Sequence, residues 1–141
     1  MTKTIDPFTG TWQLNIAQSK LPWPAPQRMI TVIVSDFEEI SVREETLDDD
    51  GQAHTITLKA RFDAKDYPVT GSPVADAVAY ERVDPRTIKG TIKQHGKPIL
   101  VETVIIAEDG NTFRGDYLIP GPDGNNITGF AVHERCTPRK E

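Results

Sequence analysis

The sequence predicts an all-β protein, an antiparallel up-and-down (meander) β-barrel of about 8–10 strands with little or no helix. Apolar and polar residues alternate with a period of two along most of the chain, and turn residues interrupt this alternation at short intervals. The segment Gly10-Thr11-Trp12 also indicates a barrel, because a small residue close to a large aromatic one is suited to the crowded end of a closed barrel.

The alternating segments follow one another along the chain and are joined by turns. The clearest is the fourth, in which His54, Ile56 and Phe62 share one face with Leu58 and Ala60. Residues 63–76 are predicted to form a loop, because Pro68 and Gly71 favour turns over strands. The predicted strands run over residues 11–17, 28–35, 39–47, 54–62, 77–83, 87–94, 99–107, 112–119 and 126–136. Closing this meander would remove its two exposed edges and bring the first strand beside the last.

A chain of 141 residues has the length of one domain. We expect a single barrel domain over residues 6–136, with a flexible N-terminal tail over residues 1–5 and a C-terminal tail over residues 137–141. The first residues lack the apolar segment of a signal peptide. If no signal has been removed, the sequence predicts a cytoplasmic protein.

Composition excludes several classes of function. A net charge of -5 with scattered lysines and arginines argues against a nucleic-acid partner, and no apolar run approaches the ~20 residues that membrane insertion by a helix needs. Cys136 is the only cysteine, so neither an internal disulfide nor a cysteine-based metal cluster is expected. Phosphate-loop, dinucleotide and Gly-x-Ser-x-Gly motifs are absent, and we expect no cofactor. Three scattered histidines, and a turn at residues 48–51 that lacks the later ligands of a calcium loop, predict no metal site.

Gly10-Thr11-Trp12 and Arg135 resemble the calycin group, which comprises lipocalins, fatty-acid-binding proteins and avidins. In those families the first strand opens with Gly-x-Trp, and an arginine on the last strand often packs across the tryptophan. The resemblance implies a cation–π contact between Arg135 and Trp12, worth about 0.5–2 kcal/mol.

A closer resemblance is to a group of small bacterial lipocalin-like proteins, most of which have no assigned function. It rests on Asp6-Pro7-Phe8, Leu14-Asn15, Ser19-Lys20, Asp66-Tyr67-Pro68-Val69-Thr70-Gly71 and Asp109-Gly110, together with the first-strand motif. This resemblance implies the fold and no catalytic residue. The chain departs from the fatty-acid-binding proteins, because a proline-rich segment over residues 19–27 forbids the helix pair that they have there.

Several polar residues are in phase with the apolar faces of their strands, and they would line a cavity if those faces point inward. They are Glu44, His54, Tyr80, Arg82 and Tyr117. The alternative interpretation of each is a position near a strand end, where the side chain reaches solvent.

Three further residues have two interpretations each. Trp23, on the stiff loop Leu21–Pro26, either covers the barrel mouth or packs on the wall. Tyr67 lies either in a rigid connection or in a second wall of the mouth. His133 shares its side of the last strand with Arg135 and lies either in the cavity or outside it.

The leading hypothesis is a protein that binds a small, largely apolar molecule inside the barrel, with Trp23 as the lid and Tyr80, Tyr117, His54 and Glu44 as contacts. The alternative is a cofactor-independent isomerase, cyclase or hydrolase. In that enzyme His54 or His133 is the base, Glu44 orients it and a tyrosine is the electrophilic donor. A third hypothesis is a structural module that forms a homodimer through residues 28–35, because Val32-Ile33-Val34 is apolar on both faces. The sequence does not decide between these three.

Overall fold

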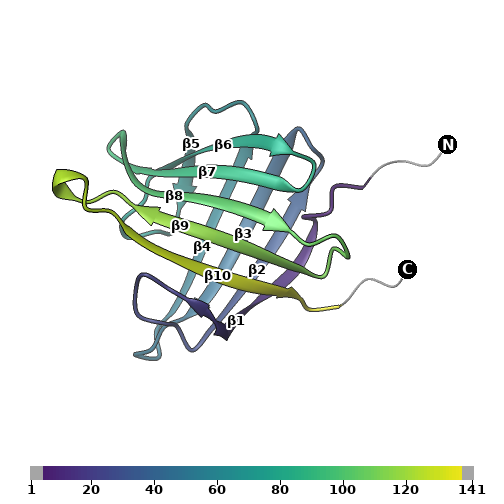
Figure 1. Cartoon of the computed structure of the whole chain (residues 1–141), viewed down its shortest axis with the longest axis horizontal. Coiled ribbons are helices and arrows are strands. Elements are labelled where there is room, and N and C mark those ends of the chain that lie inside the picture. The colour runs from purple at the N-terminus through teal and green to yellow at the C-terminus, as the bar shows by residue number, and fades with distance from the viewer. Residues whose placement is uncertain (1–4, 138–141) are drawn as a thin grey trace.

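The structure, a computed structural model, describes residues 5–137 and forms a closed barrel of ten antiparallel strands (Figure 1). Each strand pairs with the next along the chain, and the last pairs with the first. The predicted all-β meander barrel is confirmed, and its architecture is consistent with a calycin-like fold. The predicted tails at residues 1–5 and 137–141 lie outside the described residues, apart from Ile5 and Thr137. The strands are β1 (Gly10–Lys20), β2 (Arg28–Ser35), β3 (Glu39–Leu47), β4 (Ala53–Arg61), β5 (Tyr67–Thr70), β6 (Ala77–Asp84), β7 (Thr87–Gln94), β8 (Lys97–Ile106), β9 (Thr112–Ile119) and β10 (Ile127–Arg135).

The loop predicted over residues 63–76 contains the short strand β5, so that part of the prediction is wrong. Tyr67 and Pro68 pair with β6, while Val69 and Thr70 pair with β4. Pro68 has no N–H to donate to a ladder, and Gly71 ends the strand with a φ of 91°. The sequence of this strand resembles a loop because it contains Pro68 and is followed by Gly71. For the same reason the strand closes the barrel with few hydrogen bonds. A single turn of 3-10 helix, η1 (Pro122–Gly124), connects β9 and β10.

One end of the barrel is closed by the expected contact between Trp12 and Arg135. Trp12 is fully buried, and the guanidinium carbon of Arg135 lies 4.2 Å from the centre of its ring. The two residues are also register partners across β1 and β10. Arg135 donates hydrogen bonds to the backbone oxygens of Pro7, Thr9 and Gly110, so it ties three segments together at this end.

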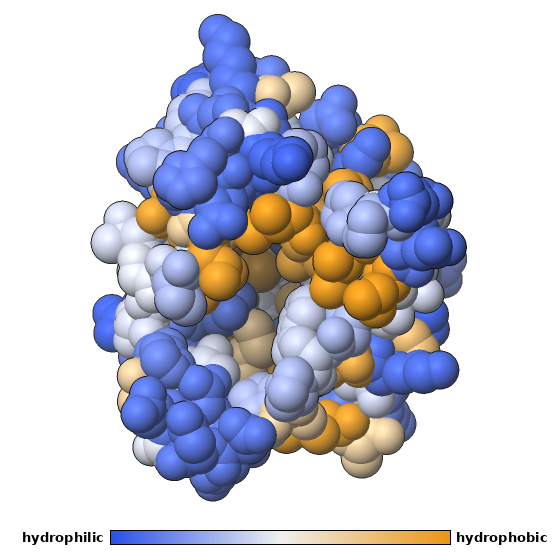
Figure 2. Space-filling view, turned by 90° about the vertical axis from the view of Figure 1, so that its left-hand side faces the viewer, coloured by the Kyte–Doolittle hydropathy of each residue, from blue (hydrophilic) through white to orange (hydrophobic). Residues whose placement is uncertain are grey.

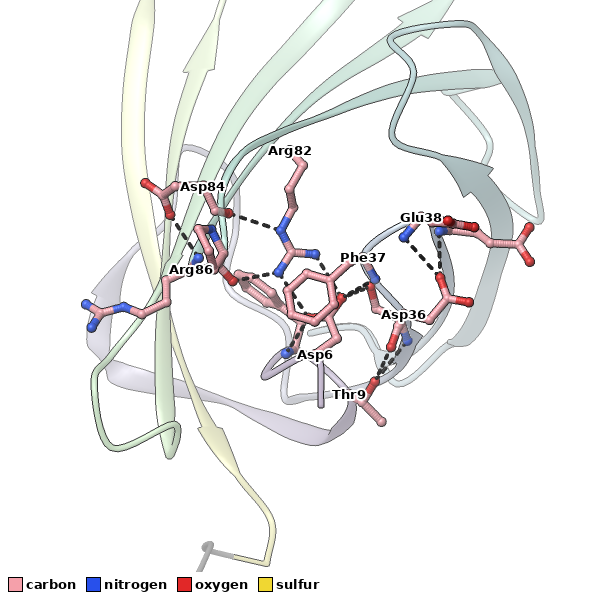
Figure 3. Close-up of polar contacts among 12 residues, drawn as sticks. Asp6, Thr9, Asp36, Phe37, Glu38, Arg82, Asp84 and Arg86 are labelled. Carbon is pink, nitrogen blue, oxygen red and sulfur yellow. Dashed lines mark hydrogen bonds and ion pairs between the residues drawn. The ribbon is translucent and has the colours of Figure 1, made fainter. Parts of the chain in front are cut away.

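A second arginine fills the same closed end from inside (Figure 3). Arg82 donates two hydrogen bonds, of 2.8 and 3.1 Å, to the buried carboxylate of Asp6. That carboxylate also accepts hydrogen bonds from the Ser35 hydroxyl and from two backbone N–H groups. Burial raises the pKa of Asp6, but these hydrogen bonds outweigh burial and hold it below its usual value. Three aromatic rings surround the guanidinium, with centres 4.7 to 5.2 Å from its carbon: Phe8, Phe37 and Phe62.

The dimer predicted through residues 28–35 would need an apolar outer face on β2. Val34, in β2, points outward with 62% of its surface exposed, and the dimer through this strand stays a prediction. Within residues 5–137, no helix is long and apolar enough to cross a membrane.

Candidate functional site

A cavity of about 590 Å³ opens at the end of the barrel opposite the Trp12–Arg135 contact. Figure 2 shows this mouth as a hollow with apolar residues around it and a mostly hydrophilic rim. The rim is built by the connections that follow β1, β3, β5, β7 and β9. The cavity walls are mostly apolar side chains, among them Met29, Ile33, Ile40, Val42, Ile56, Leu58, Val78, Ile88, Leu100, Val104 and Phe113.

All six candidate residues that the sequence singles out as binding or catalytic line this cavity. They are Trp23, Glu44, His54, Tyr80, Tyr117 and His133. Tyr67 does not line it, and its hydroxyl donates a 2.7 Å hydrogen bond to Asp63. The same connection instead contributes residues 72–75 to the mouth. Arg82, also expected to point inward, lies at the closed end with Asp6.

Four residues form one row across the wall made by β6, β7, β8 and β9. Tyr80 is the register partner of Gly90, Gly90 of Glu102, and Glu102 of Tyr117. A Cβ atom on Gly90 would lie 2.8 Å from the Tyr80 ring and 3.2 Å from Oε1 of Glu102. The missing side chain of Gly90 therefore gives the Tyr80 ring and the Glu102 carboxyl the space to lie against the wall.

Glu44 approaches this row from the other side of the barrel. It lies on β3, which is five strands away from β8 in either direction around the ten-stranded ring. Figure 1 shows β6 to β10 crossing in front of β2, β3 and β4, so the two groups form opposite walls. Glu44 and Glu102 thus belong to opposite walls of the same cavity.

Neither carboxyl has a hydrogen-bond or ion-pair partner within the described part of the chain. Burial among apolar side chains raises the pKa of Glu44 to about 7. Burial, and secondly the negative charge of Glu44, raises the pKa of Glu102 to about 7 as well. Near neutral pH each carboxyl is therefore partly protonated and partly ionised. The protonated form can donate a hydrogen bond, and the ionised form can only accept one.

The two tyrosines keep their protons. Burial, and then the charges of Glu102 and Glu44, raise the pKa of Tyr80 and Tyr117 well above 10. No hydrogen bond joins either hydroxyl to another of residues 5–137. The Tyr117 ring lies 5.0 Å from the ring of Trp23, which is 39% exposed, so this aromatic pair forms part of the mouth.

Each histidine has a contact other than the two carboxyls. His133 stacks on Phe113 with ring centres 4.4 Å apart, and burial lowers its pKa to about 4, so it is neutral at pH 7. Its Nδ1 atom is buried without a hydrogen-bond partner. His54 Nε2 lies 2.6 Å from Oδ2 of Asp48 near the mouth. Across residues 5–137 neither histidine is hydrogen-bonded to Glu44, and no group of three or more His, Cys, Asp or Glu is arranged to hold a metal.

Sequence reasoning missed Glu102 and Thr31, which both line the cavity. Glu102 alternates with Leu100, Val104 and Ile106, and this period of two could have predicted its inward direction. The opposite face of β8 is also largely apolar, however, so the pattern did not distinguish the two faces. Thr31 is the register partner of Glu44, and its buried hydroxyl oxygen has no hydrogen-bond partner.

Comparisons with models of known protein families, with curated proteins and with solved structures gave no match.

Proposed function

We propose that this protein is a lipocalin-like binding protein that holds a small, largely apolar molecule inside its barrel. The observation that carries the proposal is the open cavity of about 590 Å³ with mostly apolar walls. Cavities that bind small molecules typically measure about 300–1,000 Å³ and combine apolar walls with a few polar groups. In this proposal Trp23 covers the mouth, and Glu44, His54, Tyr80 and Tyr117 contact the ligand.

The enzyme that the sequence offers as an alternative has less support. Its mechanism requires Glu44 to orient a histidine base, and this orientation works through a hydrogen bond. His54 Nε2 lies 2.6 Å from the carboxylate of Asp48 instead, and His133 stacks on Phe113. We therefore favour binding over acid–base catalysis by a His–Glu pair.

Binding of the neutral fluorescent probe N-phenyl-1-naphthylamine tests the proposed function. Ile56→Trp should fill part of the cavity, because Ile56 lines it, whereas Thr57→Trp on the outer face of the same strand is the matched control. We expect the probe to brighten with the wild type and with Thr57→Trp. We expect the Ile56→Trp variant to bind it at least about 10-fold more weakly, the effect of a change near 1.4 kcal/mol. No brightening with the wild type, or equal binding by all three proteins, would overturn the proposal.

A further inference from the structure

We infer that the ligand carries a cationic amine, which binds between Glu44 and Glu102 with the rest of the ligand against the apolar walls. This inference rests on the proposed function and names the chemical class of the ligand. Three observations carry it: the charges that line the cavity, the placement of the two carboxyls, and the unpartnered polar groups around them.

The charged side chains of the cavity are acidic. Glu44, Glu102 and Asp48 line it, and no lysine or arginine among the described residues does. Asp48 has its own partner in His54, whereas the two glutamates have none. The chain does supply a cation to a buried carboxylate elsewhere, since Arg82 pairs with Asp6 at the closed end. A cation that comes with the ligand would supply what Glu44 and Glu102 lack, and an anionic ligand such as a fatty acid would be repelled.

The two carboxyls lie at mid-depth in the barrel, on opposite walls. Towards the closed end the cavity is lined by Ile40, Val42, Val104 and Phe113, and towards the mouth by Met29, Leu100 and Ile119. A charged group at this depth therefore has apolar surface on both sides of it. This matches an amine on a hydrocarbon or aromatic body and does not match a strongly hydrated polyvalent cation.

The groups around the carboxyls suit an ammonium group, which has hydrogen-bond donors and no acceptor. Tyr80 is only 6% exposed, and its hydroxyl oxygen is free to accept within the described structure. Tyr117 offers a second hydroxyl, and the faces of both rings attract cations. The Nδ1 atom of His133 and the hydroxyl of Thr31 are also buried without partners beside the same cavity.

Protonation of the pair supports the same inference. Burial raises the pKa of each carboxyl to about 7. Tyr80 and Tyr117 beside them keep their protons, and Thr31, the register partner of Glu44, is neutral. His54, on β4, lies towards the mouth against Asp48, and His133, which is neutral at pH 7, lies towards the closed end. An ammonium group bound between the carboxyls would favour their ionised forms. Binding of an amine near pH 7 should therefore release protons from Glu44 and Glu102.

Three probes with one body separate this inference from the proposed function. They are 4-phenylbutylamine, 4-phenylbutan-1-ol and 4-phenylbutanoic acid, titrated into the full chain by calorimetry at pH 7. We expect the amine to bind about 10- to 100-fold more tightly than the alcohol, and the acid to bind most weakly. If the alcohol binds and the amine binds no more tightly, the amine inference fails and the proposed function stands. If none of the three binds, and N-phenyl-1-naphthylamine does not bind either, both fail.

Isosteric variants test whether Glu44 and Glu102 themselves bind the amine. Glu44→Gln and Glu102→Gln should each weaken amine binding by about 10-fold and change alcohol binding less than about 3-fold, which also shows that the cavity is intact. Glu45→Gln is the matched control, because Glu45 is exposed on the outer face of β3 next to Glu44 and carries the same charge. Equal effects of all three variants on the amine would overturn the inference.

Proton release gives a readout that a purely structural role of the carboxyls would not change. Titrations in two buffers of different ionisation enthalpy should show protons released when the amine binds to the wild type, and fewer released with Glu102→Gln. Proton uptake, or no release with the wild type, would count against the inference.

Discussion

Glu102→Gln should change how the stability of the protein depends on pH. The pKa of Glu102 is about 7 in the folded protein and 4.5 without burial, because the cavity wall and the charge of Glu44 disfavour its ionised form. The folded protein therefore binds this proton more tightly than the unfolded chain does. As a consequence, the contribution of Glu102 to the free energy of unfolding falls as the pH rises from about 4.5 to about 7, and it stays low above that.

The size of the effect follows from the two pKa values. Each pH unit between them costs about 1.4 kcal/mol, so Glu102 lowers the stability by about 3 kcal/mol once it is ionised. This value is an upper figure, because the side chain faces an open cavity that water can enter. Glutamine has the same shape and does not titrate. Relative to the wild type, Glu102→Gln should therefore gain up to about 3 kcal/mol between pH 5 and pH 8.

Urea unfolding at several pH values between 5 and 9, followed by near-ultraviolet circular dichroism, measures this difference. Glu45→Gln serves as the control, because Glu45 is exposed on the outer face of the opposite wall. Parallel curves for the wild type and Glu102→Gln would refute the reasoning. They would mean that Glu102 ionises in the folded protein as easily as in the unfolded chain.

Two further substitutions test buried groups elsewhere. Arg82→Met leaves the buried carboxylate of Asp6 without its cation and should cost about 3–5 kcal/mol of stability in urea unfolding. His133→Asn should remove a contribution of the opposite sign. Burial lowers the pKa of His133 from 6.5 to about 4, so this one residue costs the wild type about 3 kcal/mol as the pH falls from 6.5 to 4. The stability of the variant relative to the wild type should therefore rise by about 3 kcal/mol over this range. Urea unfolding at pH 7 and pH 4 measures that difference.

Matched controls exist for both. Arg61→Met removes an exposed arginine whose nearest carboxylates lie 3.9 and 4.0 Å away, and it should cost less than about 1 kcal/mol. His95→Asn is the control for the histidine, because it removes a side chain that is 87% exposed. An Arg82→Met variant as stable as Arg61→Met, or a His133→Asn variant whose stability relative to the wild type is the same at pH 7 and pH 4, would contradict these expectations.

Much of the fold could be predicted from the sequence because most strands have one apolar and one polar face. The inward directions of Glu44, His54 and Tyr80 follow from this alternation, and all three line the cavity. Closure of the meander predicted that the first and last strands are neighbours, and the resemblance to the calycin group implied the contact between Trp12 and Arg135, which the structure shows.

The features that escaped prediction have physical reasons. Strand β5 contains Pro68 and ends at Gly71, so its composition is that of a turn, and its pairing depends on the neighbouring strands. Glu102 lies on a strand that is largely apolar on both faces. Asp6 lies before the first strand, where no periodicity indicates its direction, so its pairing with Arg82 depends on tertiary structure alone.

The contrast between the two sets of buried carboxyls is the strongest reason to assign the mid-barrel pair a function. At the closed end the chain gives Asp6 an arginine, a hydroxyl and two backbone N–H groups, and its pKa falls. At mid-depth it gives Glu44 and Glu102 no such partners in the described structure, and their pKa values rise. Buried polar groups in folded proteins are normally satisfied, and those that are not tend to mark functional sites. Since the same fold gives one carboxylate several protein partners and leaves two without any in its cavity, we infer that a ligand supplies the missing partner.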